Sequence, residues 1–424
     1  MTETDTRRRF VGRWSLLSSL AAATPEVRLL VLTQLAFNVG FFMVLPYLSV
    51  YLFEDLGLRA AFVGAVLGLR TFSQQGLFFV GGSLADRWGV KPVVLTGCAC
   101  RILGFAGLAL CTSVPGIVVA TVLTGFAGAL FSPAVESALA TAAGRTDDGG
   151  RSRVDAFALF TVCGQIGSFT GPLVGSILLL IADFAAACLA AAGVFAAILL
   201  AHLRWLPSGP GAHATDSWRD GWREVLGNRP FLLFAAAMST QLVAYNQLYL
   251  LLPLEVERAW GSQSPLGWFF ALSSVFVVAA QLPITKRAHT HGALPLGLAV
   301  IAAGFAVMAV AVPAQPRGIP GLIPPAAFVL LLALGQMIAM PVARDAIARM
   351  ASGRRLGTYY GVFASIGGAA VLLGSVVLGA LIDSVPSTGW PLAAPWCAVG
   401  ALLTGSALTV RVVFPARRRE ETTD

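Results

Sequence analysis

The segment Gly82-Ser83-Leu84-Ala85-Asp86-Arg87-Trp88-Gly89-Val90-Lys91 is short, charged and bounded by glycines, and it lies between two long apolar stretches. Charged side chains are costly to bury in lipid, so this segment is predicted to form a turn in water at a membrane face. Gly82 and Gly89 permit close packing and a tight reversal. Asp86 ends the preceding predicted helix, where its carboxylate could bond the amides that open the next helix. Arg87 and Lys91 are basic residues of the kind expected on the cytoplasmic side.

The composition is that of an integral membrane protein. The chain has 424 residues, 57% of them hydrophobic and 12% charged, and its mean hydropathy is +0.78. A soluble globule of this length would carry roughly twice that share of charge. The length accommodates about a dozen spans of ~20 residues. The first thirty or so residues lack the pattern of a cleaved signal peptide, so the first span is expected to stay in the mature protein.

The net charge of +8 is explained by membrane topology and does not require a nucleic-acid partner. Of the 29 Lys and Arg residues, Arg59, Arg258 and Arg317 fall on one predicted face, and Arg70 and Arg101 fall within predicted spans. The remaining 24 fall on the other face, which predicts that both termini are cytoplasmic. The six cysteines lie in or beside apolar stretches without metal-ligand spacing, which favours buried thiols.

The apolar pattern predicts an all-α fold with twelve transmembrane helices in two six-helix bundles. The expected helices span 28–53, 59–82, 92–111, 115–140, 154–180, 185–206, 230–254, 264–285, 293–314, 321–345, 357–382 and 391–414. The expected parts are a cytoplasmic amphipathic segment at 1–27, an N-terminal bundle at 28–206, a cytoplasmic linker at 207–229, a C-terminal bundle at 230–414 and a cytoplasmic tail at 415–424. Trp218, Trp222 and Val225 recur at helical spacing and predict a surface helix within the linker.

The two halves share a repeat. Thr33-Gln34-Leu35 and Leu45-Pro46 recur as Thr240-Gln241-Leu242 and Leu252-Pro253, both at an offset of 207. A shared offset in corresponding helices indicates two related, pseudo-symmetric halves.

A second motif lies in the predicted helix at 154–180: Gly167-Ser168-Phe169-Thr170-Gly171-Pro172-Leu173-Val174-Gly175. Its glycines at 167, 171 and 175 share one helix face and admit a close neighbour, and Pro172 bends the helix. An ordinary packing seam would show the same glycines.

The charged segment resembles the loop between the second and third helices of the major facilitator superfamily, and the glycine–proline motif resembles that of its exporters. With the half-repeat, these features identify the chain as a member of that superfamily. Further residues are similar to the MdtH-type branch of drug/proton antiporters, namely Gly68-Leu69-Arg70, Gln74-Gln75-Gly76, Arg101, and Pro341 with Asp345 before Gly357-Thr358-Tyr359. In the family the glycine–proline motif is associated with a sealed cavity in antiporters, so the resemblance implies export over import.

Two features depart from the family pattern. Many drug/proton antiporters carry an arginine midway along the helix that corresponds to 115–140, and this chain has none there, so the usual proton relay is in doubt. The counterpart of the charged segment in the second half, at 281–287, lacks the aspartate and the glycines. Closure of the cavity at the cytoplasmic face, the inner gate, is therefore expected to depend mainly on residues of the first half.

In this fold the helices that correspond to 28–53, 59–82 and 230–254 line the cavity, so the resemblance implies substrate-cavity candidates there: Gln34, Asn38, Arg70, Gln74, Gln241, Tyr245, Asn246 and Tyr249. Abundant phenylalanine and small residues suit an amphiphilic organic solute. Arg70 could meet substrate or form a structural ion pair, and the sequence leaves both open. For Arg101, on a helix that is peripheral in the family, a structural partner across the bundle is favoured.

The sequence places no carboxylate and no histidine as deep as the two arginines. The candidates for proton coupling or gating are Glu136, Asp155, Asp345 and Arg101. A buried carboxyl group near an arginine can titrate near neutrality, but Glu136 and Asp345 could equally bond helix ends as a gate.

The leading hypothesis is a secondary active transporter that exports drug-like or natural-product molecules, coupled to protons through alternating access. The alternative is a transporter of an anionic metabolite that uses Arg70 and need not be proton-coupled. An enzyme is not expected, because the chain has no nucleotide loop, metal spacing or nucleophile elbow. No cofactor or metal is expected. The expected setting is a monomer in the cytoplasmic (inner) membrane, with lipid, protons and an amphiphilic solute as partners.

Overall fold

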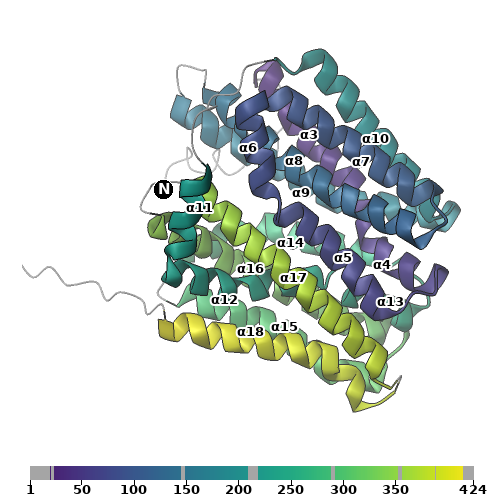
Figure 1. Ribbon diagram of the computed structural model, residues 1–424. Coiled ribbons are helices and arrows are strands. Elements are labelled where there is room, and N and C mark those ends of the chain that lie inside the picture. The colour runs from purple at the N-terminus through teal and green to yellow at the C-terminus, as the bar shows by residue number, and fades with distance from the viewer. Residues whose placement is uncertain are drawn as a thin grey trace, which may run out of the picture.

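The computed structural model describes residues 20, 23–144, 149–208, 218–287, 292–351, 356–386 and 388–413. The described residues form helices joined by short connections (Figure 1). Most of the predicted N-terminal segment at 1–27 and the whole tail at 415–424 lie outside the described residues.

The helices of the first half occupy the upper part of Figure 1. They are α3 (Pro25–Phe42), η2 (Leu45–Tyr47), α4 (Leu48–Val50), η3 (Tyr51–Asp55), α5 (Ala60–Gln75), α6 (Phe78–Trp88), α7 (Val90–Leu110), α8 (Val114–Gly144), α9 (Gly149–Ile181) and α10 (Phe184–Trp205).

The predicted linker helix is confirmed as α11 (Trp218–Gly227), and the helices of the second half follow it in the lower part of Figure 1. They are α12 (Arg229–Asn246), α13 (Leu251–Trp260), α14 (Leu266–Arg287), α15 (Ala293–Ala311), η4 (Val312–Ala314), α16 (Gly318–Met350), α17 (Leu356–Ser384), η5 (Trp390–Ala393) and α18 (Ala394–Val413).

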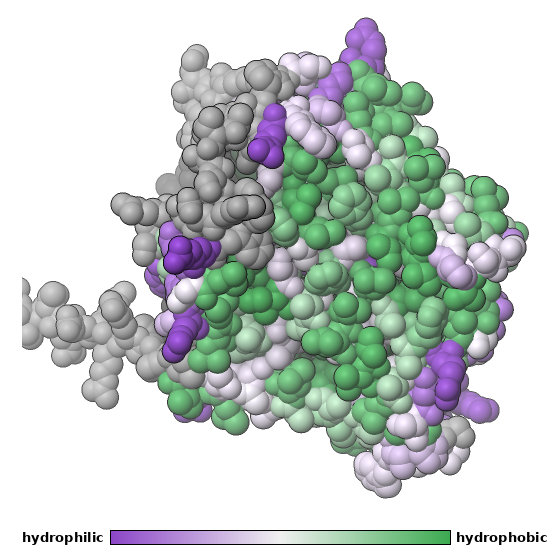
Figure 2. All heavy atoms as spheres, viewed as in Figure 1, coloured by the Kyte–Doolittle hydropathy of each residue, from purple (hydrophilic) through white to green (hydrophobic). Residues whose placement is uncertain are grey.

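Within the described residues, nine helical segments are long and apolar enough to cross a membrane. The other three predicted helices are not among these nine segments. The one at 59–82 is the pair α5/α6, and the one at 230–254 is the pair α12/α13. The one at 264–285 is α14, whose apolar part is limited to Leu266–Gln281. Apolar side chains cover the visible face between the two ends of the molecule, where hydrophilic residues gather (Figure 2). This is the distribution expected of a protein surrounded by lipid.

Three helices that we predicted as continuous are broken. The first ends at Phe42, before a 3-10 turn that holds Pro46, and its repeat ends at Asn246, before α13 with Pro253 in its first turn. Proline has no amide hydrogen and is tolerated where a helix begins, so the repeated Leu-Pro pairs mark breaks in both halves. The predicted helix at 59–82 is broken after Gly76, the residue that caps α5.

The charged segment is mostly helical, so the prediction of a turn across its whole length is wrong. Residues through Trp88 belong to α6, and the reversal is confined to Gly89, whose φ is 85°. Glycine adopts this backbone conformation without the strain that a Cβ would cause. A Cβ added to Gly82 would meet no atom of the described residues within 4 Å, which contradicts its predicted packing role. The side chain of Asp86 lies outside the described residues, while Lys91 Nζ donates to the Leu203 carbonyl at 3.0 Å.

The two halves meet along α5 and α17, which lie side by side in Figure 1. A Cβ added to Gly64 would lie 2.1 Å from the Ser375 carbonyl oxygen, and one added to Gly379 would lie 2.2 Å from that of Ala60. The Asp383 carboxylate accepts hydrogen bonds of 2.9 Å from the first two amides of α5. We call this contact the α5–α17 seam, and only glycine allows its backbones to approach so closely.

The glycines of the second motif pack against α3 within the first half. Cβ atoms added to Gly167, Gly171 and Gly175 would lie 2.5, 2.8 and 2.2 Å from carbonyl oxygens of that helix and the residue after it. The Tyr47 hydroxyl donates to the Pro172 carbonyl at 2.6 Å. The motif is therefore a packing seam in this structure, and its association with export stays a prediction.

Candidate functional site

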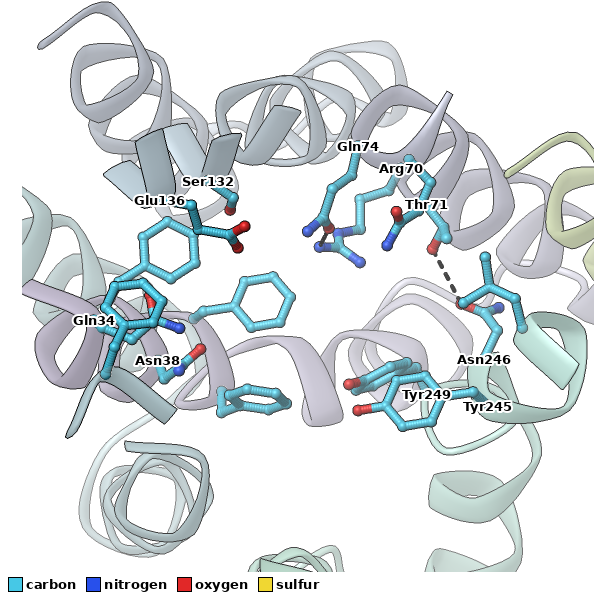
Figure 3. A pocket seen from close by; sticks show the side chains of 16 residues that line it. Gln34, Asn38, Arg70, Thr71, Gln74, Ser132, Glu136, Tyr245, Asn246 and Tyr249 are labelled. Carbon is cyan, nitrogen blue, oxygen red and sulfur yellow. Dashed lines mark hydrogen bonds between the residues drawn. The ribbon is translucent and has the colours of Figure 1, made fainter. Parts of the chain in front are cut away.

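A cavity of about 230 Å³ lies between the two halves (Figure 3). It is bordered by α3, α5, α8, α9, α12 and the turn after α12. Its sixteen lining residues are mainly aromatic or neutral polar, with one arginine and one carboxylate: Gln34, Phe37, Asn38, Phe41, Phe42, Arg70, Thr71, Gln74, Gln75, Ser132, Glu136, Phe160, Leu242, Tyr245, Asn246 and Tyr249.

The structure brings seven of the eight substrate-cavity candidates to this cavity: Gln34, Asn38, Arg70, Gln74, Tyr245, Asn246 and Tyr249. The exception is Gln241, the repeat counterpart of Gln34, which is buried and does not line the cavity. The role of the seven in substrate binding stays a prediction.

Arg70 enters the cavity wall from α5 and is 4% exposed. Its Nη2 donates to Gln74 Oε1, one helical turn away, and its guanidinium carbon lies 4.7 Å from the Phe41 ring centroid. Its Nε has no hydrogen-bond partner, and no salt bridge of Arg70 occurs among the described residues. Tyr245 and Tyr249 are near enough to interact electrostatically with it, and their hydroxyls point into the cavity (Figure 3).

Arg101 lies behind the cavity wall on α7 and is 1% exposed. Its guanidinium carbon is 4.8, 5.1, 5.9 and 5.3 Å from the ring centroids of Phe37, Phe41, Phe105 and Phe195. Such cation–π contacts stabilise a desolvated cation. Within the described part of the chain, its three guanidinium nitrogens have no hydrogen-bond acceptor. Its partners across the bundle are therefore aromatic rings on α3 and α10.

The two halves are also joined by hydrogen bonds beside the cavity. Thr71 Oγ1 on α5 donates to Asn246 Oδ1 on α12 at 3.0 Å (Figure 3), and Asn246 Nδ2 donates to Ser375 Oγ on α17 at 3.0 Å. This polar chain is buried. Because it crosses from one half to the other, any separation of the halves here breaks it.

An aromatic cluster from both halves bounds the cavity on the side of α4 and α13. The Phe270 ring on α14 lies 6.1 Å from Phe42 of the first half and 6.0 Å from Tyr249 of the second. Farther from the cavity, Ser176 Oγ on α9 donates to the Ser264 carbonyl at 3.0 Å. The halves therefore contact each other on this side of the cavity.

The carboxylate candidates occupy different environments. Glu136 on α8 lines the cavity, is exposed, and points its carboxyl group inward (Figure 3). Asp345 lies outside the cavity, 61% exposed, and pairs with Arg349 at 3.0 Å. The side chain of Asp155 lies outside the described residues. Glu136 is therefore the acidic candidate that shares the cavity with Arg70.

The phenylalanines of the cavity wall were not predicted, although the sequence carries a signal for them. Gln34, Phe37, Asn38, Phe41 and Phe42 recur at spacings of three and four, which is one face of a helix. Extending the stripe from the two polar positions would have found the three aromatic ones.

A sequence model of the Major Facilitator Superfamily matches residues 30–325. The chain belongs to this superfamily. It is therefore a multi-pass membrane transporter and not an enzyme. The described residues hold no group of three or more His, Cys, Asp or Glu side chains suited to a metal ion.

Relatives within the superfamily cover most of the chain. An uncharacterised MFS-type transporter of Mycobacterium tuberculosis is 40% identical over 372 residues, which is 84% of this chain and 86% of the relative. The multidrug resistance protein MdtH of Aeromonas hydrophila is 30% identical over 403 residues, 93% of this chain and 94% of that protein.

Solved structures of other transporters show the same fold. A POT family transporter in complex with 5-aminolevulinic acid superposes with a TM-score of 0.75 at 13% identity, covering 93% of this chain and 98% of that one. The nucleoside transporter NupG also gives 0.75, at 16% identity, covering 92% and 100%. At such identities the likeness concerns the fold alone.

Proposed function

We propose that this transporter exports amphiphilic drug-like or natural-product molecules from the cytoplasm in exchange for protons, by alternating access and as a monomer. The observation that carries the proposal is one cavity between the halves that combines aromatic walls, neutral hydrogen-bonding groups and an exposed carboxylate, Glu136. Such a lining suits a solute with a large apolar body and few polar groups. The resemblance to a multidrug resistance protein over most of the chain supports export.

The proposed topology has twelve transmembrane helices, with both termini and α11 in the cytoplasm. The excess of Lys and Arg on that face supports this orientation. The aromatic cluster at Phe270 and the Ser176–Ser264 bond then lie on the outer side of the cavity. In this arrangement the closed side faces outward, and a solute enters from the cytoplasm or the inner leaflet.

Proton coupling is proposed to act through Glu136. Proton and solute compete for one cavity only if the titrating group lies in it, and Glu136 meets this condition. Arg344 of the second half lies near enough to interact electrostatically with Glu136, so an approach of the two halves on this side would change its charge environment. Asp345 pairs with Arg349 on the surface of α16. It is therefore the weaker candidate for the proton-carrying residue, and we assign it to the gate that bonds helix ends at the inner face.

The test is flux in proteoliposomes under an imposed pH gradient, with cationic, neutral and anionic amphiphiles of matched apolar bodies. Wild-type protein is expected to move at least one of them with the gradient. Glu136→Gln should abolish the gradient dependence while counterflow exchange of labelled for unlabelled solute continues. Asp345→Asn is the matched control and should keep gradient-driven flux. Gradient-driven flux that survives in Glu136→Gln would refute this coupling site.

A second candidate function, transport of an anionic metabolite without proton coupling, is favoured by one observation. Arg70 lines the cavity and has no salt bridge among the described residues. This function predicts anion flux that ignores the pH gradient and disappears in Arg70→Ala.

A further inference from the structure

Two arginines near the cavity have donors that nothing in the described structure satisfies. Arg70 Nε and all three guanidinium nitrogens of Arg101 are buried without a hydrogen-bond partner. Guanidinium groups stay protonated in proteins, so both side chains carry a full positive charge. An unpaired charge is expensive in a membrane interior, and two of them in one site call for a compensating anion.

The two guanidinium groups belong to one cluster. Both approach the Phe41 ring, at 4.7 Å for Arg70 and 5.1 Å for Arg101, so their central carbons are no more than about 10 Å apart. A Cβ added to Gly128 of α8 would lie 2.9 Å from Arg101 Nη2 and 3.2 Å from the Gln74 amide nitrogen. Gly128 thus leaves room where Arg101 and Gln74 approach each other.

We propose that Arg70, Gln74 and Arg101 form an anion subsite that takes the acidic group of the transported solute: a carboxylate, sulfonate or phosphate. Arg70 and Gln74 line the cavity and make the direct contacts. Arg101 contributes its charge from behind Phe37 and Phe41, which form the intervening wall. The inference rests on the proposed function, because it assigns a substrate class to the same cavity.

Glu136 does not supply the missing anion in this structure. Its carboxyl group enters the cavity from α8, apart from the Arg70–Gln74 pair (Figure 3), and no salt bridge links it to either arginine. Figure 3 also shows space between these groups, bounded by Tyr245 and Tyr249 on the other side. An acidic group with two adjacent oxygens suits the arginine fork, because guanidinium binds such groups through paired N–H donors.

The experiment measures binding to the full-length protein in lipid nanodiscs without any gradient. The probes are 2-naphthylacetate, its neutral amide and 2-naphthylethylamine, which share an apolar body and differ in charge. We expect the acid to bind at least about tenfold more tightly than the amide. Arg70→Gln should remove this preference. Arg101→Gln should reduce it, and Arg101→Lys, which keeps the charge, should retain most of it. The exposed Arg411→Gln is the matched control and should bind as wild type.

Equal binding of acid and amide by wild-type protein would overturn the proposal, as would an acid preference that persists in Arg70→Gln. An unchanged preference in a folded Arg101→Gln variant would remove Arg101 from the subsite. Titration with chloride and sulfate separates the sources of the anion. The subsite is supported if chloride or sulfate weakens binding of the acid in wild-type protein but not in Arg70→Gln. A role in solute binding is refuted if these inorganic anions bind while the affinities for the acid and the amide remain equal.

This binding measurement, combined with the proteoliposome flux assay, separates the subsite from the exporter function. Acid preference without gradient-driven flux would leave the subsite standing and refute the exporter. Gradient-driven flux of the neutral amide without acid preference would leave the exporter and refute the subsite.

Discussion

Replacement of Gly64 by alanine tests whether the α5–α17 seam sets the distance between the halves. The new Cβ would lie 2.1 Å from the Ser375 carbonyl oxygen, whereas ordinary contact begins at 3.4 Å, so α5 and α17 must separate locally by about 1.3 Å. The obstructing atom is backbone and cannot rotate away. A shift of this size would also lengthen the Thr71–Asn246 hydrogen bond beyond its present 3.0 Å.

The expected cost follows from two opposing terms. Overpacking a tight contact costs about 1–3 kcal/mol, and a backbone obstacle belongs at the upper end of that range. Alanine recovers up to ~1 kcal/mol over glycine in a helix. Gly64→Ala should therefore lower the free energy of unfolding by about 2 kcal/mol. Gly193→Ala in α10, where an added Cβ would meet no atom of the described part of the chain within 4 Å, is the matched control and should be neutral or slightly stabilising.

Unfolding can be followed with a thiol-reactive dye, because Cys98, Cys163 and Cys188 are buried in the folded protein. Gly64→Ala should unfold at a lower temperature than both wild type and Gly193→Ala. Gradient-driven flux should change in the same variant, since the seam lies between the two halves that the proposed alternating access would move. If Gly64→Ala matches Gly193→Ala in both thermal stability and flux, the seam does not hold the halves as described.

Other perturbations of the contacts between the halves have defined outcomes. Asp383→Ala removes the carboxylate that accepts from two amides of α5, and should cost about 1–2 kcal/mol in the same unfolding assay, with Asp383→Asn recovering part of it. Asn246→Ala breaks both bonds of the polar chain and should cost about 1 kcal/mol, because a membrane-buried hydrogen bond contributes ~0.6 kcal/mol. Burial raises the pKa of Glu257, as do the two carboxylates of η3. Its charged form is thus disfavoured in the folded state, so stability should rise as pH falls through the raised pKa, and thermal unfolding from pH 8 to pH 5 should show a weaker dependence in Glu257→Gln.

The sequence predicted the helices best where an apolar run stands alone between polar or glycine residues. The predicted helix at 185–206 is observed as α10 (Phe184–Trp205), and the one at 293–314 as α15 with η4. The breaks at the two Leu-Pro pairs were not predicted, because the residues on both sides of each pair are apolar. Hydropathy measures side-chain polarity and is not changed by the backbone hydrogen bond that a proline removes. The charged segment was predicted as a turn because its charges were taken to end the helix, whereas α6 continues through Asp86 and Arg87 to Trp88.

The sequence pointed to most of the polar residues that line the cavity and to none of its phenylalanines. Gln34 and Asn38 are conspicuous in an apolar helix, whereas the phenylalanines around Arg101 resemble any lipid-facing position in the sequence. Gln241 was a candidate because it is a polar position on a helix that lines the cavity in this fold, but its side chain is buried away from the cavity. Gln34 lines the cavity and Gln241 is buried, so each half uses its copy of the motif differently. That difference depends on side-chain packing between helices, which spacing along one chain does not reveal.

The helices that fall short of a self-sufficient membrane span are α5/α6, α12/α13 and α14, and they are also helices at which the halves meet. Arg70, Asn246 and the broken backbone that shape the cavity lower the gain from transferring these segments into lipid. During synthesis they are therefore expected to enter the bilayer only when neighbouring, more apolar helices are already present. The residues that line the cavity are thus expected to influence the order of assembly, because the more apolar helices would insert first and receive the others.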